Sequence, residues 1–121
     1  MLQQFLLPET VARQDGVSAE LALEECGKPL LLTLGITRTT EQESLEVSVW
    51  GSVDGEHWRE IARFPQKFYC GTYPMVLDLS REPALRYLRA HWKMGRWTDA
   101  PPLFGFYLHL EDVKLRRAGA A

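Results

Sequence analysis

A chain of 121 residues has room for one domain built around a single hydrophobic core. Its formal net charge of −2 gives no reason to expect nucleic acid or a membrane surface as a partner. No run approaches the roughly 18 apolar residues of a membrane span, and residues 1–8 lack the basic start and cleavage site of a secretory signal. We therefore expect one soluble, cytoplasmic domain over residues 1–121.

Apolar and polar residues alternate along most of the chain, which is the period of a strand with one buried face. Helical spacing of three and four residues is not convincing in any window. The pattern predicts strands over 17–25, 30–38, 45–52, 86–94 and 104–110, and shorter ones over 2–7, 58–64 and 74–79. The residues predicted to point inward are Val17, Ala19, Leu21, Leu23, Leu30, Leu32, Leu34, Ile36, Leu45, Val47, Val49, Leu88, Ala90, Trp92, Met94, Phe104, Phe106, Leu108 and Leu110.

Turn residues separate these runs. Asp54-Gly55 predicts a tight turn between Trp50 and Trp58. Short, regularly spaced strands with one apolar face are typical of a sandwich or barrel. We predict an all-β fold, an antiparallel β-sandwich of about eight strands with jelly-roll topology. Further breaks are expected at Gly27-Lys28-Pro29, Gly71, Pro83, Gly95 and Pro101-Pro102.

If successive strands run antiparallel, the loops alternate between the two ends of the sandwich. Loops 38–44, 65–73 and 95–103 then share one end, and loops 26–29, 53–57 and 80–84 share the other. Cys26 and Cys70 fall at opposite ends, far beyond the roughly 7 Å that a disulfide allows between Cα atoms. Both are predicted to be free thiols.

The first of these ends collects aromatic and charged residues. Loops on a rigid sheet often carry binding residues, and aromatic faces beside polar groups suit sugars, peptides or a partner surface. The same aromatics would equally serve to close the open end of the core. The predicted ligand-binding residues are Phe68, Tyr69, Tyr73, Arg96, Trp97 and Asp99.

Catalytic and metal-binding patterns are weak. The three histidines, His57, His91 and His109, have no zinc spacing. His91 and His109 are expected to meet on one outer sheet face, either as a site for an anionic or sugar ligand or as a solvated or subunit-contacting face. Cys70 has no local base beside it. We therefore predict no enzyme, no catalytic residue, no metal site and no cofactor. Residues expected near the two histidines are Arg89, Lys93, Tyr107 and Trp50.

The charge is unevenly distributed along the chain. Residues 1–60 hold 11 acids and 4 bases (−7), and residues 61–121 hold 5 acids and 10 bases (+5), which together give −2. This asymmetry either helps subunits to pair or averages out because strands from both halves interleave.

One stretch resembles a known family. Residues 49–58, Val-Trp-Gly-Ser-Val-Asp-Gly-Glu-His-Trp, are similar to the Ser-x-Asp-Gly-x-x-Trp hairpin of discoidin (coagulation factor 5/8 C-type) domains. Residues 85–89, Leu-Arg-Tyr-Leu-Arg, resemble a later strand of that family. The resemblance covers about residues 45–92 and implies a galactose-binding-like sandwich that binds carbohydrate, lipid or cell surfaces. This chain lacks the paired terminal cysteines of those domains and is shorter, and no binding residue is carried over.

These observations favour a non-catalytic binding module for carbohydrate or another small ligand. The alternative is a structural subunit of a multiprotein or phage-like assembly. The expected partner is an unknown small ligand or a protein, with a homo-oligomer as a further possibility, and neither nucleic acid nor membrane is expected.

Overall fold

The computed structural model describes residues 3–23, 27–39, 43–96 and 103–113. Every regular element in these ranges is a strand, so none of them contributes a helix long and apolar enough to cross a membrane. The strands are β1 (Gln3–Ala12), β2 (Gly16–Val17), β3 (Leu21–Ala22), β4 (Pro29–Thr39), β5 (Glu43–Ser52), β6 (Trp58–Arg63), β7 (Gly71–Asp78), β8 (Tyr87–Arg96) and β9 (Phe104–Asp112).

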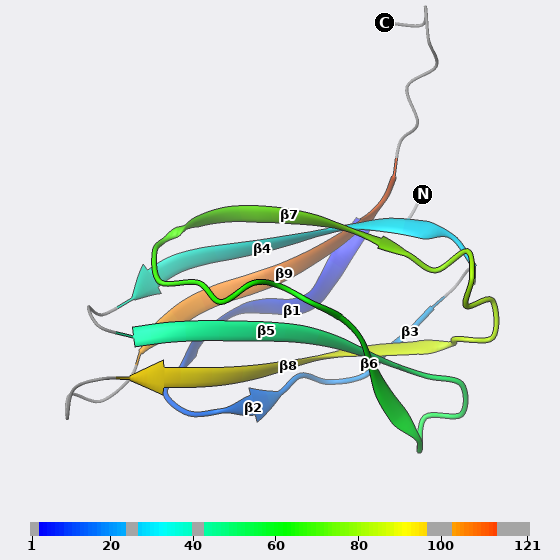
Figure 1. Cartoon of the computed structure of the whole chain (residues 1–121), viewed down its shortest axis with the longest axis horizontal. Coiled ribbons are helices and arrows are strands. Elements are labelled where there is room, and N and C mark those ends of the chain that lie inside the picture. The colour runs from blue at the N-terminus through cyan, green and yellow to red at the C-terminus, as the bar shows by residue number, and fades with distance from the viewer. Residues whose placement is uncertain (1–2, 24–26, 40–42, 97–102, 114–121) are drawn as a thin grey trace, which may run out of the picture.

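The strands form two antiparallel sheets that pack face to face (Figure 1). Sheet A has the order β1-β9-β4-β7, and sheet B has the order β2-β8-β5-β6, with β3 also paired to β8. The short strands β2 and β3 share one position beside β8. With those two taken as one strand, the sheet orders become 1-8-3-6 and 2-7-4-5, which is a jelly roll. The predicted fold class is confirmed.

The core lies between the sheets and is made by the residues whose alternation predicted it. The inward residues of β4, β5 and β9 are almost completely buried. In β8 the pattern weakens toward one end, where Trp92 and Met94 are half-buried against the core. The predicted inward residues that are buried are Leu30, Leu32, Leu34, Ile36, Leu45, Val47, Val49, Leu88, Ala90, Phe104, Phe106, Leu108 and Leu110.

Residues 17–25 do not form the single strand that their alternation predicted. Val17 is 50% exposed and Ala19 is also exposed, so both inward assignments were wrong, whereas Leu21 and Leu23 pack against the core. The reason is a break at Ser18. Its hydroxyl accepts the Ala90 backbone N–H at 2.8 Å, in the place of a strand carbonyl. The strand therefore divides into β2 and β3.

Strand β1 is longer than the predicted strand over residues 2–7. Its pairing with β9 has register shifts between Phe5 and Leu7 and between Leu7 and Thr10. Leu6 and Leu7 are consecutive and both buried. Such bulges interrupt the two-residue period while the strand itself continues, so alternation alone shows only its first part.

The loops gather at two ends as predicted. At one end, Thr39 pairs with Phe104, the β5–β8 ladder closes at Glu43 and Arg96, and β7 begins at Gly71. The β5–β6 hairpin and residues 79–86 lie at the other end (Figure 1). Cys70 is an exposed free thiol at the first end. Cys26 lies outside the described residues.

Strands from the two halves of the sequence interleave. In sheet A, β1 and β4 come from the acidic half and alternate with β9 and β7 from the basic half. In sheet B, β8 from the basic half lies between β5 and the β2–β3 pair. The asymmetry along the sequence is therefore not an asymmetry between two ends of the fold.

Candidate functional site

The outer face of sheet B carries charged and aromatic side chains in register across β5 and β8. Because residues that face each other across a strand pair lie on the same side of a sheet, the ladder fixes which side chains are neighbours. Three rows follow from it, and they pair Glu46 with Lys93, Ser48 with His91, and Trp50 with Arg89.

Two of these rows are joined with Trp58 of β6 into a stacked array. Its members are Ser48, Trp50, Trp58, Arg89 and His91. The Arg89 guanidinium lies 4.1 Å from the ring centroid of Trp58 and donates from Nε to His91 Nε2 at 3.0 Å. The His91 ring stacks on Trp50 with centroids 4.5 Å apart and an interplanar angle of 19°. Trp50 Nε1 in turn donates to the Ser48 hydroxyl at 2.9 Å. Each ring is thus held by two neighbours, which makes this a pre-ordered surface.

The array also fixes the protonation of His91. A guanidinium can only donate, so His91 Nε2 must accept and the proton of the neutral ring lies on Nδ1. The pKa of His91 is lowered from its ordinary value of 6.5, first because partial burial disfavours the cation and then because Arg89 repels it, while Glu60 acts in the opposite direction. The neutral ring therefore presents an N–H donor at Nδ1.

We expect an NMR titration to give His91 a pKa below 6.5. Arg89→Gln should raise that pKa, because it removes the repelling charge. Since the folded pKa is the lower one, the contribution of His91 to stability is complete above about pH 6.5 and is lost as the pH falls toward the folded pKa. Arg59→Gln, on β6, is the matched control and should leave the titration unchanged. A His91 pKa that does not respond to Arg89→Gln would contradict this account of the array.

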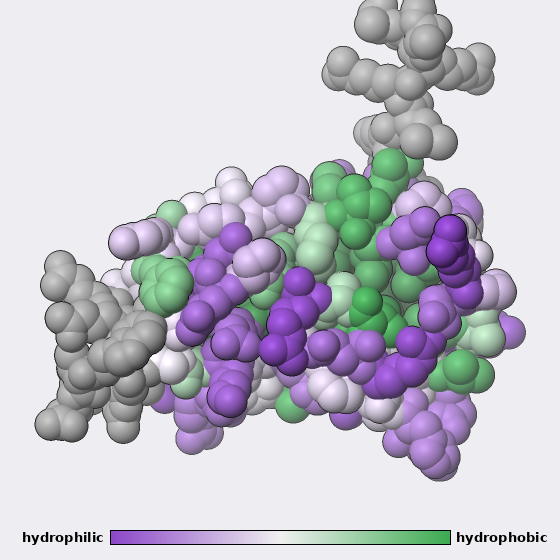
Figure 2. Space-filling view, in the orientation of Figure 1, coloured by the Kyte–Doolittle hydropathy of each residue, from purple (hydrophilic) through white to green (hydrophobic). Residues whose placement is uncertain are grey.

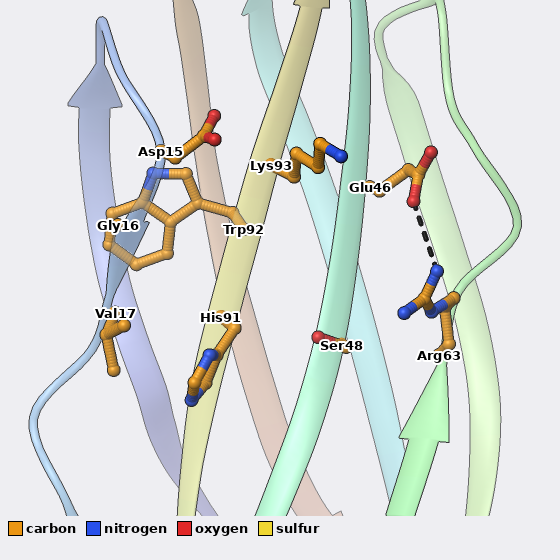
Figure 3. Close-up of a pocket in the computed structure, with 9 residues that line it drawn as sticks. All are labelled: Asp15, Gly16, Val17, Glu46, Ser48, Arg63, His91, Trp92 and Lys93. Atoms are coloured by element: carbon orange, nitrogen blue, oxygen red, sulfur yellow. Dashed lines mark hydrogen bonds and ion pairs between the residues drawn. The ribbon is translucent and has the colours of Figure 1, made fainter. Parts of the chain in front are cut away.

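A groove of about 460 Å³ opens beside the array on the same face (Figure 3). Lys93 extends across it toward Glu46. Arg63, at the end of β6, is held by Glu46 at 3.3 Å and by Glu60 at 2.7 Å. The residues that line the groove are Asp15, Gly16, Val17, Glu46, Ser48, Arg63, His91, Trp92 and Lys93.

The opposite wall is formed where β2 approaches β8. Trp92 lies against Gly16, where a Cβ atom would be 2.4 Å from the indole ring. The indole Nε1 donates to the Gln14 carbonyl at 2.9 Å, and Asp15 Oδ1 accepts the Met94 backbone N–H at 2.8 Å. Gly16 is therefore required for the close approach that places Asp15 and Val17 at the rim.

The predicted meeting of His91 and His109 is wrong. His91 is on β8 in sheet B, whereas His109 is on β9 in sheet A, and their side chains point to opposite outer faces. His109 packs instead edge-to-face on Phe5, with centroids 5.1 Å apart, and Tyr107 also contacts Phe5. Both side chains do point away from the core, as the alternation predicted, but alternation does not say which sheet a strand joins. The predicted neighbours Trp50, Arg89 and Lys93 do lie with His91.

The structure brings together three of the six predicted end-loop residues. Phe68 and Tyr69 are exposed, with ring centroids 6.5 Å apart. Tyr73 is half-buried against the core, donates its hydroxyl to the Tyr69 carbonyl at 2.7 Å and lies under the Lys67 ammonium. Tyr73 therefore serves partly to close the core. Arg96 ends β8 opposite Glu43, while Trp97 and Asp99 lie outside the described residues.

The Asp54-Gly55 turn forms as predicted, with Gly55 at φ 81°. Asp54 Oδ1 accepts the backbone N–H groups of Glu56 and His57 at 2.8 and 2.9 Å, and Oδ2 lies 2.7 Å from His57 Nδ1. The side chains of Asp54, Glu56 and His57 are close enough to share a metal ion. These hydrogen bonds within the turn account for the cluster without one.

The hydrogen bonds that the Asp54 carboxylate accepts in this turn should stabilise the protein at neutral pH and be lost in acid. Hydrogen bonds from the backbone and then the side chain of His57, followed by the Glu56 N–H, hold the pKa of Asp54 well below its ordinary 3.8. A depressed folded pKa gives stability that is present above about pH 4 and is lost as the pH falls through the folded value. Asp54→Asn should therefore lose less stability than the parent between about pH 5 and pH 2, measured by urea unfolding. Glu56→Gln is the control, and a parent-like pH dependence in Asp54→Asn would refute this role.

Sequence reasoning missed most of the groove. Glu46 and Ser48 could be placed on the outer face by alternation, but Arg63 reaches them only through the β5–β6 register. Asp15 and Gly16 belong to no alternating run or binding motif in the sequence. Only the pairing of β2 with β8 brings them to the site. No spacing in the sequence signals that pairing.

In comparisons with known proteins, no protein-family model matches the chain, and no curated protein matches it.

Proposed function

We propose that this protein is a non-catalytic binding module and that its ligand lies in the groove on the outer face of sheet B. The observation that carries the proposal is the groove itself, which has a volume within the roughly 300–1,000 Å³ typical of small-molecule sites. It lies beside side chains already fixed by stacking and hydrogen bonds. Preorganised groups lose little conformational entropy on binding, which favours ligand binding at this face.

The groups around the groove suit a ligand that carries hydroxyls and a negative charge. His91 offers an N–H at Nδ1, Ser48 offers a hydroxyl, and Lys93 offers an exposed ammonium. Glu46 and Asp15 provide acceptors on either side, and Val17 provides an apolar contact. A sugar ring presents hydroxyls to such mixed donors and acceptors, and an acidic sugar adds a carboxylate for Lys93. The class is therefore an acidic carbohydrate, in keeping with the resemblance of the hairpin to discoidin domains.

Calorimetric titration with glucuronate, galacturonate and neutral galactose tests this class. We expect an acidic sugar to bind more tightly than galactose, and Lys93→Ala to weaken that binding about tenfold or more, the cost of a charged hydrogen bond. Val53→Ala, in the hairpin turn, is the control because Val53 is exposed and does not line the groove. Absence of binding for all three sugars, or binding that is indifferent to Lys93, would exclude the acidic sugar.

The aromatic end loops are the second candidate surface, because Phe68 and Tyr69 are exposed next to each other. Phe68→Ala and Tyr69→Ala distinguish the two surfaces. If either variant abolishes binding while Lys93→Ala does not, the ligand lies at the end loops. If Lys93→Ala abolishes binding while neither end-loop variant does, the ligand lies in the groove of sheet B.

A further inference from the structure

The outer face of sheet A differs in kind from that of sheet B. Its residues are fixed by the registers of β4 with β7 and β9 and of β1 with β9. Sheet B presents Glu46, Glu60, Arg63, Arg89 and Lys93 on its outer face. The side chains on the corresponding face of sheet A are Phe5, Val11, Pro29, Leu31, Thr33, Arg38, Thr72, Pro74, Val76, Asp78, Tyr107, His109 and Glu111.

Several of these side chains are large, apolar and open to solvent. Val76 is 59% exposed, and Phe5 is 49% exposed although it packs against Tyr107 and His109. Leu31 is half-buried in the same row as Val76. In Figure 2 strongly hydrophilic residues gather over the lower half of the molecule, where sheet B lies. The upper half over β7 is mainly pale or green, apart from the loops at the right. Aromatic enrichment with few charges is the composition of an interface core.

The charge pattern identifies the kind of partner. The charged side chains of this face divide between the two ends of its strands: Asp78 and Glu111 lie at the end where β4 begins, and Arg38 lies at the end where β4 finishes. A second copy brings the same charges to the contact, so self-association is favoured where opposite charges of the two copies meet. A two-fold axis that lies in the face and runs across the strands places Arg38 of each copy at the end where the other copy carries Asp78 and Glu111.

The size of the face is sufficient for a specific contact. Four strands about 4.8 Å apart, each about nine residues long at about 3.3 Å per residue, cover roughly 600 Å². Two such faces bury roughly 1,200 Å², the lower limit of specific protein–protein interfaces. A reversible pair is therefore expected rather than an obligate one.

We propose that the outer face of sheet A is the contact between two copies of this chain in a reversible face-to-face dimer. Because sheet B lies on the other side of each sandwich, both grooves stay open in that dimer. The proposal is independent of what the groove binds.

Sedimentation velocity from roughly 1 µM to 1 mM tests the dimer. Val76→Lys on β7 and Phe5→Lys on β1 place a charge in the contact from opposite edges of the sheet. Both positions are exposed, so both variants should fold. Since a dimer brings like charges together, each should raise the dissociation constant about tenfold or more. Val53→Lys, at a residue 55% exposed in the hairpin turn, should leave it unchanged.

Three results would overturn the proposal. The first is a parent protein that stays monomeric up to about 1 mM. The second is an equal effect of Val53→Lys, which would show a general effect of charge. The third is a loss of dimer in Val76→Lys with none in Phe5→Lys, because that pattern belongs to edge-to-edge pairing through β7.

Discussion

Phe106→Ala should lower the free energy of unfolding by about 3–5 kcal/mol, a large part of the roughly 5–15 kcal/mol typical of a domain. Phe106 is fully buried in β9, a central strand of sheet A. Its ring meets Trp92 of sheet B edge-to-face with centroids 5.6 Å apart. The substitution therefore leaves a cavity where the two sheets join, next to the residue that supports β2. Urea unfolding followed by tryptophan fluorescence measures the loss.

Phe68→Ala is the matched control for that substitution. Phe68 is a loop phenylalanine that is 41% exposed, so its truncation removes less buried area than that of Phe106 and leaves no cavity between the sheets. We expect it to cost less than about 1 kcal/mol. Equal costs for the two substitutions would mean that the core does not lie between the sheets at Phe106.

Gly35→Ala should destabilise the protein by about 1–3 kcal/mol through a single neighbour, Tyr107. Gly35 lies on the outer side of β4, and the Tyr107 ring from β9 covers it. A Cβ atom at Gly35 would lie 2.1 Å from Tyr107 Cζ. The ring must leave its position, so its packing over β4 is lost. Chemical denaturation measures the cost.

A double-mutant cycle isolates this contact. In a Tyr107→Ala background the ring is absent, and Gly35→Ala should then cost much less than it does alone. Independent, additive costs would show that Tyr107 does not rest on Gly35. The same displacement would push the ring into the face proposed for self-association, so Gly35→Ala should also alter the dissociation constant of the dimer.

The parts of the fold that could be predicted are those in which one physical requirement acts alone. In residues 30–36 and 104–110 every second residue is apolar because one side faces the core, with Leu31 as an additional apolar residue on the outer side, and both strands form as expected. The turn at Asp54-Gly55 is equally local, because the carboxylate binds the next backbone N–H groups and the glycine takes a positive φ.

The parts that could not be predicted depend on which strands become neighbours. His91 and His109 have the same parity, but they belong to different sheets. Val17 has the parity of a core residue, yet it lies at the exposed edge of sheet B because Ser18 interrupts the ladder. The groove requires three separate pairings, so no local pattern in the sequence could contain it.

Amide chemical-shift mapping with titrated glucuronate shows whether the ligand lies in the groove of sheet B. The prediction is that shifts concentrate on Ser48, His91 and Lys93, with Val17 and Arg63 at the edges, and that Lys93→Ala needs about tenfold more glucuronate or beyond to reach the same shifts. Shifts that concentrate on residues 68–73, with the sheet B amides unchanged, would contradict it.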